Sequence, residues 1–256
     1  MRCATPHWGD LGSGLAAFGD KIETICEIPY DEIPNFSPPS VEGHPGKLIF
    51  GRAGDTPLVV LQGRIHFYEG HTMEEVVFPT RVVAQLGIEA LILTNAAGGL
   101  DASMQPGDFM IIKDHINLTG TNPLIGPNIK ELGLRFPDMS EPYDREMSAQ
   151  LDQLLTKKNI RHSTGVYCGV TGPTYETAAE VQYLGKIGGH AVGMSTVPEA
   201  IAAKHMGLRV CGISCISNLA TGLSDKPITH DEVKEVAAKV EKDFCDFLFE
   251  FLSQLP

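Results

Sequence analysis

The sequence predicts an α/β fold, a single domain in which a central mixed β-sheet is flanked by helices on both faces. Short apolar runs alternate with segments of helical composition along most of the 256 residues, and this alternation is typical of such sheets. No internal repeat, low-complexity tract or linker divides the chain, which is long enough for one sizeable core. We therefore expect one domain over residues 1–256.

The expected strands are short apolar runs bounded by glycine, asparagine or other polar residues, a composition typical of strands. In chain order they are KLIFG (47–51), PLVVLQG (57–63), EALILTN (89–95), DFMIIKD (108–114), HAVGMS (190–195) and RVCGISCIS (209–217).

The expected helices lie between and after these runs, over 74–87, 145–159, 176–188, 197–206 and 230–253. The last of them is amphipathic, because its apolar residues recur at steps of three and four. They are Val233, Val236, Val240, Phe244, Phe247 and Phe251. Thr229, followed three residues later by Glu232, indicates a capping box that places His230 in the first helical turn.

Residues 119–143 form a long segment rich in proline, glycine and asparagine, which predicts a loop. One interpretation is a plain surface excursion. The apolar Leu134, Phe136 and Met139 instead favour a loop whose exposed side chains contact another subunit.

Composition excludes several classes of protein. With 20 Lys and Arg against 32 Asp and Glu the net charge is −12, which argues against general binding to nucleic acids or membrane surfaces. We expect no membrane-spanning segment and no signal peptide in the opening MRCATPHWGD. The six cysteines form no CxxC pair and the histidines lack metal-ligand spacing, so we expect no metal and a reducing cytoplasm.

The stretch GRIHFYEGH (63–71) holds the first candidate site. Arg64, His66 and Tyr68 occupy every second position directly after the apolar run TPLVVLQG, and Glu69 follows them. Burying such polar groups is costly unless they have partners. Ligands of open α/β sheets bind at the carboxyl ends of strands, so this position predicts a binding site.

Five further features are weaker when taken singly. GSGL (12–15) suits a phosphate but is also an ordinary turn, and TNAAGGL (94–100) allows close ligand approach but also fits a strand–helix turn. Glu176 in GPTYETAAE also fits a simple helix-dipole interaction, and Ser195 in GMSTVPEA also fits an ordinary N-cap. Asn218 also fits a turn. Together the features place polar groups at the ends of at least five strands, which indicates one convergent pocket.

These motifs, in this order over about residues 12–253, resemble those of the trimeric purine nucleoside phosphorylases. The resemblance implies a cytoplasmic homotrimer of purine salvage that needs no cofactor. Such an enzyme splits a purine nucleoside with orthophosphate into free base and ribose 1-phosphate.

The resemblance also implies a role for each matching residue. Its expected phosphate ligands are Ser13, His44, Arg64, His66, the backbone of Ala96, and Ser195. Its expected nucleoside contacts are Tyr68, Tyr175, Glu176, Met194, Asn218, His230 and, from a neighbouring subunit, Phe136. Its expected catalytic set is His66, Glu69, Glu176, Asn218 and His230, with Glu69 orienting His66 and His230 reaching the 5′-hydroxyl. Tyr175 departs from the family, which usually has phenylalanine there.

The expected substrates are 6-oxopurine nucleosides, namely inosine, guanosine and their deoxy forms. An Asn218 amide donates to N7 or O6 while Glu176 accepts from N1–H, and adenine has no N1 proton. One alternative is a methylthioadenosine phosphorylase, whose branch typically has aspartate in place of Asn218 and an apolar 5′ end. The other is a nucleoside-binding protein with impaired turnover.

The N-terminus departs from the resembled family. Its members usually carry a helix and then an apolar strand before the Gly-Ser-Gly turn, whereas this chain has MRCATPHWGDL. Pro6, Asp10 and the few β-formers predict that the segment makes no inner strand. We therefore expect the family's N-terminal helix and first strand to be missing.

Overall fold

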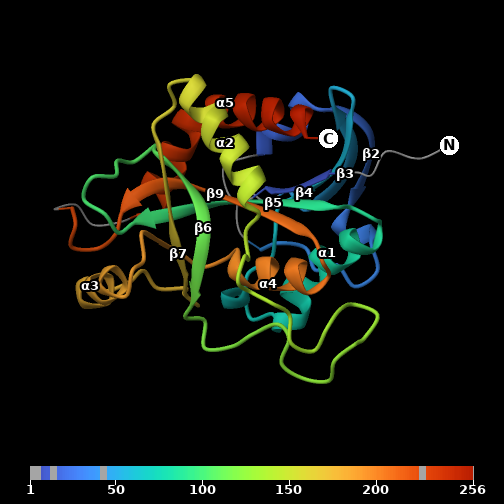
Figure 1. Cartoon of the computed structure of the whole chain (residues 1–256), viewed down its shortest axis with the longest axis horizontal. Helices are drawn as coiled ribbons and strands as arrows, with labels where there is room; N and C mark the ends of the chain where they lie inside the picture. Colours follow the sequence, from blue (N-terminus) through green and yellow to red (C-terminus); the bar gives the residue numbers. More distant parts are fainter. Residues whose placement is uncertain (1–6, 12–15, 41–44, 225–228, 256) are drawn as a thin grey trace.

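The computed structural model describes residues 7–11, 16–40, 45–224 and 229–255 (Figure 1). Its described strands form one nine-stranded mixed sheet in the order β2-β3-β4-β1-β5-β8-β7-β6-β9, in which β5 also pairs with β9. The strands are β1 (His7–Leu11), β2 (Glu23–Pro29), β3 (Lys47–Ala53), β4 (Thr56–Gln62), β5 (Ala90–Gly99), β6 (Phe109–Asn117), β7 (His162–Gly169), β8 (Ala191–Gly193) and β9 (Arg209–Leu219). The six predicted strands are confirmed, and β1, β2 and β7 are additional.

One half of the sheet closes on itself. β5 pairs in parallel with β9 and in antiparallel fashion with β8, and β8, β7, β6 and β9 complete the ring through their own pairings. The ring brings the C-terminal ends of β5 and β9 next to β8, since Gly98 lies opposite both Asn218 and Val192.

The expectation that residues ahead of Gly12 form no inner strand is wrong. His7–Leu11 forms β1, which pairs in parallel with β4 on one side and with β5 on the other. Strand preference depends strongly on context, and two neighbouring strands offer hydrogen-bonding partners that outweigh a weak intrinsic tendency.

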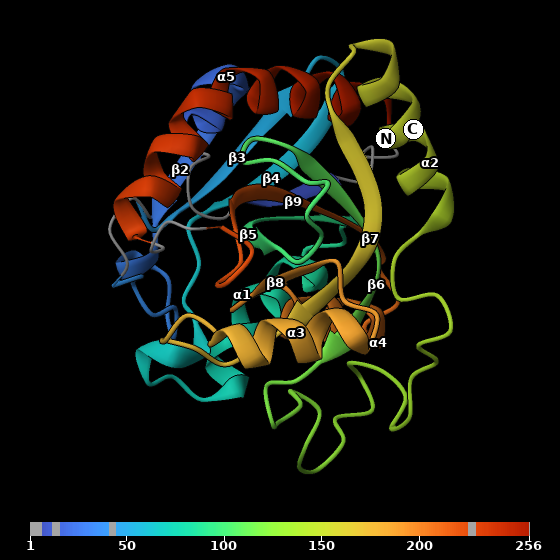
Figure 2. The ribbon, with the colours of Figure 1, turned by 90° about the vertical axis from the view of Figure 1, so that its left-hand side faces the viewer.

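Helices cover both faces of the sheet, as predicted. They are α1 (Met73–Gln85), α2 (Arg145–Lys157), α3 (Ala178–Lys186), α4 (Val197–His205) and α5 (His230–Gln254). In Figure 1, α2 and α5 lie on one side of the strands and α1 and α4 on the other, and Figure 2 shows α3 beside β7 and β8. The ends of several helices are set locally: Thr72 with Glu75 and Thr177 with Glu180 form complete capping boxes at α1 and α3.

The alternation of side chains along β4 explains the two helical layers. Leu58 and Val60 join the apolar cluster beneath α2 and α5, while Val59 and Leu61 join the cluster beneath α1 and α4. All four side chains are at most 2 % exposed. Each contributes about 1.5–3 kcal/mol through its burial, so a strand with two apolar faces stays inside the sheet.

The predicted loop is confirmed, because residues 118–144 contain neither helix nor strand. Leu134 and Phe136 are 75 % and 86 % exposed, as expected. Met139 is a correction, because its side chain is half-buried against the cluster beneath α1 and α4. None of the described helices combines the length and the apolar character that crossing a membrane requires.

Candidate active site

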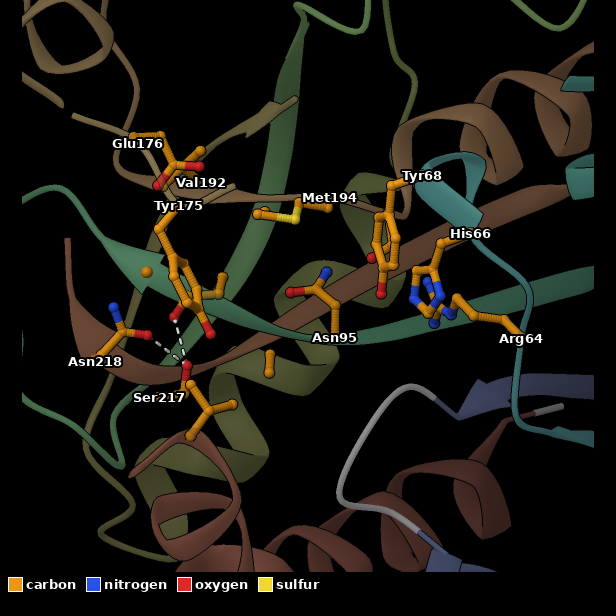
Figure 3. Close-up of a pocket in the computed structure, with 16 residues that line it drawn as sticks. Arg64, His66, Tyr68, Asn95, Tyr175, Glu176, Val192, Met194, Ser217 and Asn218 are labelled. Atoms are coloured by element: carbon orange, nitrogen blue, oxygen red, sulfur yellow. Dashed lines mark hydrogen bonds between the residues drawn. The ribbon is translucent and has the colours of Figure 1, made fainter. Parts of the chain in front are cut away.

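One pocket, shown in Figure 3, is lined by the ends of β4, β5, β8 and β9 with the segments that follow β4 and β8, by the segment after β7 and by the start of α5. Most of the predicted site residues that the structure describes line it. They are Arg64, His66, Tyr68, Ala96, Tyr175, Glu176, Met194, Ser195 and Asn218. Arg64, His66 and Tyr68 lie at one end, Glu176, Tyr175 and Asn218 at the other, and Met194 between them (Figure 3). The pocket is therefore cationic at one end and carries an amide and a carboxyl group at the other.

The cationic end begins where β4 stops. Gly63 has φ +108°, a conformation that suits glycine, and the chain then carries Arg64 into the protein with only 5 % of its surface exposed. The Arg64 guanidinium donates from Nη1 to Glu199 Oε1 at 3.1 Å and from Nη2 to the Thr94 carbonyl. A fixed, permanently charged fork of this kind suits the oxygens of phosphate.

His66 is hydrogen-bonded to Glu69. Its Nδ1 lies 2.8 Å from Glu69 Oε1, which also accepts a bond from the His66 backbone N–H. Burial alone would raise the pKa of Glu69, but hydrogen bonds from His66 and Ser40 together outweigh it and lower that pKa to about 2. Glu69 thus stays ionised and fixes the imidazole while remaining outside the pocket lining.

Tyr68 lies beside His66 in a short 3₁₀ helix, Phe67–Glu69, so the alternation seen in the sequence ends at His66. The two rings stack with centroids 4.8 Å apart. Burial, reinforced by nearby Glu69, raises the pKa of Tyr68 to about 12. The phenol is consequently a neutral wall of the pocket.

The opposite end offers a carboxyl group and an amide. Burial raises the pKa of the half-buried Glu176. Asn218 accepts a hydrogen bond from Ser217 Oγ at 2.8 Å through Oδ1 and donates through Nδ2 to the Leu219 carbonyl at 3.1 Å. The Leu219 carbonyl can only accept, so it fixes which side of the Asn218 amide is the donor and leaves Oδ1 as the acceptor towards Ser217.

Several predicted residues lie elsewhere or outside the described part of the chain. Ser13 and His44 are outside the described residues, and His230 is described only through its backbone at the start of α5. Phe136 lines a different cavity, formed by the long loop and the end of β6. Its predicted role in a neighbouring subunit's site stays a prediction.

Two local interpretations are corrected. Ser195 is not the N-cap of α4, because the helix begins at Val197 and Thr196 holds the cap position. TNAAGGL is not a strand–helix turn, since β5 continues to Gly99 and pairs with β9 throughout. The extra strand length places Asn95, Ala96, Ala97 and Gly98 along the pocket.

The sequence prediction omitted Asn95, Ser217, Val192 and Val233, which also line the pocket. Asn95 donates from Nδ2 to Thr196 Oγ1 at 2.8 Å. A signal for Asn95 was present, because it stands inside the quoted motif TNAAGGL. Among the residues that the structure describes, no group of histidine, cysteine and acidic side chains could hold a metal ion.

Comparison with known proteins gives a consistent result. Residues 15–253 match the Phosphorylase superfamily. Purine nucleoside phosphorylase 1 of Bacillus subtilis is 52 % identical over 95 % of this chain and 90 % of its own length. The purine nucleoside phosphorylase of Bos taurus is 42 % identical over 96 % and 87 %.

Solved structures agree with the sequence relatives. The crystal structure of Schistosoma mansoni purine nucleoside phosphorylase in complex with inosine superposes with a TM-score of 0.93 at 38 % identity, covering 99 % of this chain and 92 % of that one. The structure of the same protein in complex with adenosine gives the same values. Fold, pocket and sequence together assign this chain to the phosphorylase superfamily and, within it, to the purine nucleoside phosphorylases.

Proposed function

We propose that this chain catalyses the phosphorolysis of 6-oxopurine ribonucleosides and deoxyribonucleosides, such as inosine and guanosine, in purine salvage. Orthophosphate is the second substrate, and the products are the free base and (deoxy)ribose 1-phosphate. The observation that carries the proposal is the division of one pocket into a cationic end and an amide–carboxyl end.

At the cationic end, Arg64 and His66 bind phosphate, with Ser195 and the backbone at Ala96 close by. As the glycosidic bond lengthens, the ribose acquires oxocarbenium character, and the adjacent phosphate anion stabilises that cation. Tyr68 and Met194 hold the sugar between the two ends of the pocket. Orienting the two reactants in this way supplies most of the rate acceleration.

At the opposite end, negative charge develops on the departing purine. The Asn218 amide donates to N7 or O6, and the Glu176 carboxylate accepts from N1–H. Tyr175, which also lines this end, covers the base. This pairing matches a 6-oxopurine and leaves a mismatched donor against the 6-amino group of adenine.

The test of this activity is the release of hypoxanthine from inosine with and without phosphate. We expect release, together with ribose 1-phosphate, only when phosphate is present. Equal rates in phosphate-free buffer would instead identify a hydrolase. Binding of inosine without any release would identify a nucleoside-binding protein.

We further propose a cytoplasmic homotrimer whose long loop completes a neighbouring subunit's site. The exposed Phe136 and Leu134 support the contact, because a large apolar side chain left in water favours an interface. A reducing compartment is supported by Cys26, Cys168, Cys211, Cys215 and Cys245, which are free thiols.

Replacing Phe136 with alanine is expected to raise the Michaelis constant for inosine more than that for phosphate, because the lost ring covers the nucleoside. Steady-state kinetics and light scattering on the variant check this. Ile25→Ala is the control, since Ile25 is 66 % exposed on β2 and outside the loop. Full activity from a monomer would contradict the proposal.

A further inference from the structure

The start of α4 differs from the starts of the other described α-helices, in each of which the N-cap side chain accepts a hydrogen bond from a backbone N–H. Thr196-Val197-Pro198-Glu199 has the Thr-x-x-Glu spacing of a capping box, as Thr72–Glu75 and Thr177–Glu180 do. Those two pairs form complete capping boxes at α1 and α3. At α4 the Thr196 side chain makes no capping bond. The two side chains that would normally cap this helix therefore serve another purpose.

Glu199 turns inward to the phosphate end of the pocket. Its Oε1 accepts from Arg64 Nη1 at 3.1 Å, and the two side chains are 4 % and 5 % exposed. Glu75, at the same helical position in α1, is exposed and bonds to Thr72. Since the Thr94 carbonyl accepts from Nη2 of the same guanidinium, Arg64 is held from two directions. Its orientation towards an anion is thus fixed before the anion arrives.

Thr196 has a strained backbone. Its φ and ψ are 74° and −48°, and the Ser195 carbonyl accepts from the Val197 N–H at 2.8 Å across it. This is a γ-turn of the rare positive-φ form, which is unfavourable for a β-branched residue. Such strain persists only where the surroundings enforce it, and it is concentrated at functional sites.

The Thr196 hydroxyl is hydrogen-bonded to three polar side chains that line the pocket. It lies 2.8 Å from Asn95 Nδ2, 3.5 Å from Arg64 Nη1 and 3.1 Å from Ser195 Oγ. A hydroxyl has two acceptor sites and one proton. With Asn95 and Arg64 donating to it, Thr196 gives its proton to Ser195 Oγ. The Ser195 hydroxyl then has its own proton to donate, to the neighbouring Tyr167 hydroxyl or to a phosphate oxygen in the pocket that Ser195 lines.

We propose that Glu199 and Thr196 are positioning residues for phosphate: Glu199 fixes the Arg64 guanidinium, and Thr196 fixes the direction of the Ser195 hydroxyl. Neither side chain lines the pocket, so both act through the groups that do. The assignment rests on the proposed phosphorolysis, because it concerns the phosphate end of that site.

The test separates orientation from charge and from folding. Glu199→Ala removes the acceptor, whereas Glu199→Gln keeps an acceptor oxygen and removes the charge. We expect Glu199→Ala to raise the Michaelis constant for phosphate by about 10- to 100-fold, because a misplacement of about 1 Å can cost about 100-fold. The Michaelis constant of Glu199→Ala for inosine is expected to stay within about twofold of the parent's. Glu199→Gln is expected to keep most of the phosphate affinity, because it retains the acceptor oxygen that orients Arg64 and the charge of Glu199 is not what phosphate binding requires.

Glu75→Ala is the matched control, because it removes a glutamate from the same position of another helix. It is expected to lower Tm without separating the two Michaelis constants. If Glu199→Ala does not fold, Thr196→Val provides the second test: it keeps the shape and loses the hydroxyl. Thr196→Val is expected to weaken phosphate use selectively, and Thr196→Ser to restore it.

The parent enzyme is measured first, by phosphate-dependent turnover and by the rise in Tm that phosphate causes. If the parent cleaves inosine without phosphate and phosphate does not raise its Tm, the proposed function is wrong, and the roles assigned to Glu199 and Thr196 are wrong with it. If the parent passes both measurements but the folded variants Glu199→Ala and Thr196→Val keep its Michaelis constant for phosphate, only the positioning roles of Glu199 and Thr196 are overturned. Equal loss in Glu199→Gln and Glu199→Ala likewise overturns orientation as the role of Glu199.

Discussion

Replacing Arg64 with alanine is expected to lower kcat/KM for phosphate by about 10²–10³, the loss typical of removing a charged donor from a site of developing charge. The guanidinium is buried and held in one orientation by Glu199 and the Thr94 carbonyl, so the substitution removes a preorganised charge. Initial rates at saturating inosine with varied phosphate measure the effect. Arg64→Lys is expected to recover only part of it, because an ammonium group lacks the planar fork.

Replacing Arg64 with alanine is also expected to destabilise the fold, by about 3–5 kcal/mol, because it leaves Glu199 as a buried charge without its partner. Adding Glu199→Gln removes that charge. The double variant is therefore expected to regain much of the lost Tm while keeping the phosphate defect. If the double variant recovers both its Tm and its use of phosphate, Arg64 acts on folding alone. An unchanged Michaelis constant for phosphate in Arg64→Ala would contradict a role of Arg64 in phosphate binding.

Replacing Asn218 with aspartate is expected to invert the preference between inosine and adenosine. The amide Nδ2, which donates to the Leu219 carbonyl at 3.1 Å, becomes a carboxylate oxygen that can only accept. A mismatched hydrogen-bonding edge costs up to about 10⁴ in kcat/KM. The new carboxylate also lies at the same end of the pocket as Glu176, which raises the pKa of that group further.

The measurement is the ratio of kcat/KM values for inosine and adenosine in parent and variant. Asn159→Asp is the matched control, because it makes the same chemical change at an exposed position after α2, outside the pocket lining. It is expected to keep the parent's ratio. If Asn218→Asp keeps that ratio too, Asn218 does not select the base.

Part of the fold follows from short-range patterns in the sequence. The apolar run of β4 alternates between two helical layers because successive strand residues face opposite sides. Thr72 with Glu75 and Thr177 with Glu180 mark two helix starts, because a capping box satisfies backbone groups within one turn. These features depend on residues only a few positions apart.

The strands that the sequence prediction missed depend on distant partners. β1 is poor in β-formers and is an inner strand because β4 and β5 pair with it from both sides. β7, with the polar start His162-Ser163-Thr164, pairs with β6 and β8. Neither pairing leaves a periodic signal within the strand itself, and so composition alone did not identify them.

The sequence by itself determined the layered α/β fold, the long loop and most of the polar residues of the pocket, because each stands at the end of a recognisable strand or in a family motif. Only the tertiary structure decided how they are held. Thr196 and Glu199 have the spacing of a helix cap, yet Glu199 bonds to Arg64, 135 positions away along the chain. A buried guanidinium needs a charged partner, and the buried Glu199 meets that need instead of capping α4. This competition exists only once the chain has folded.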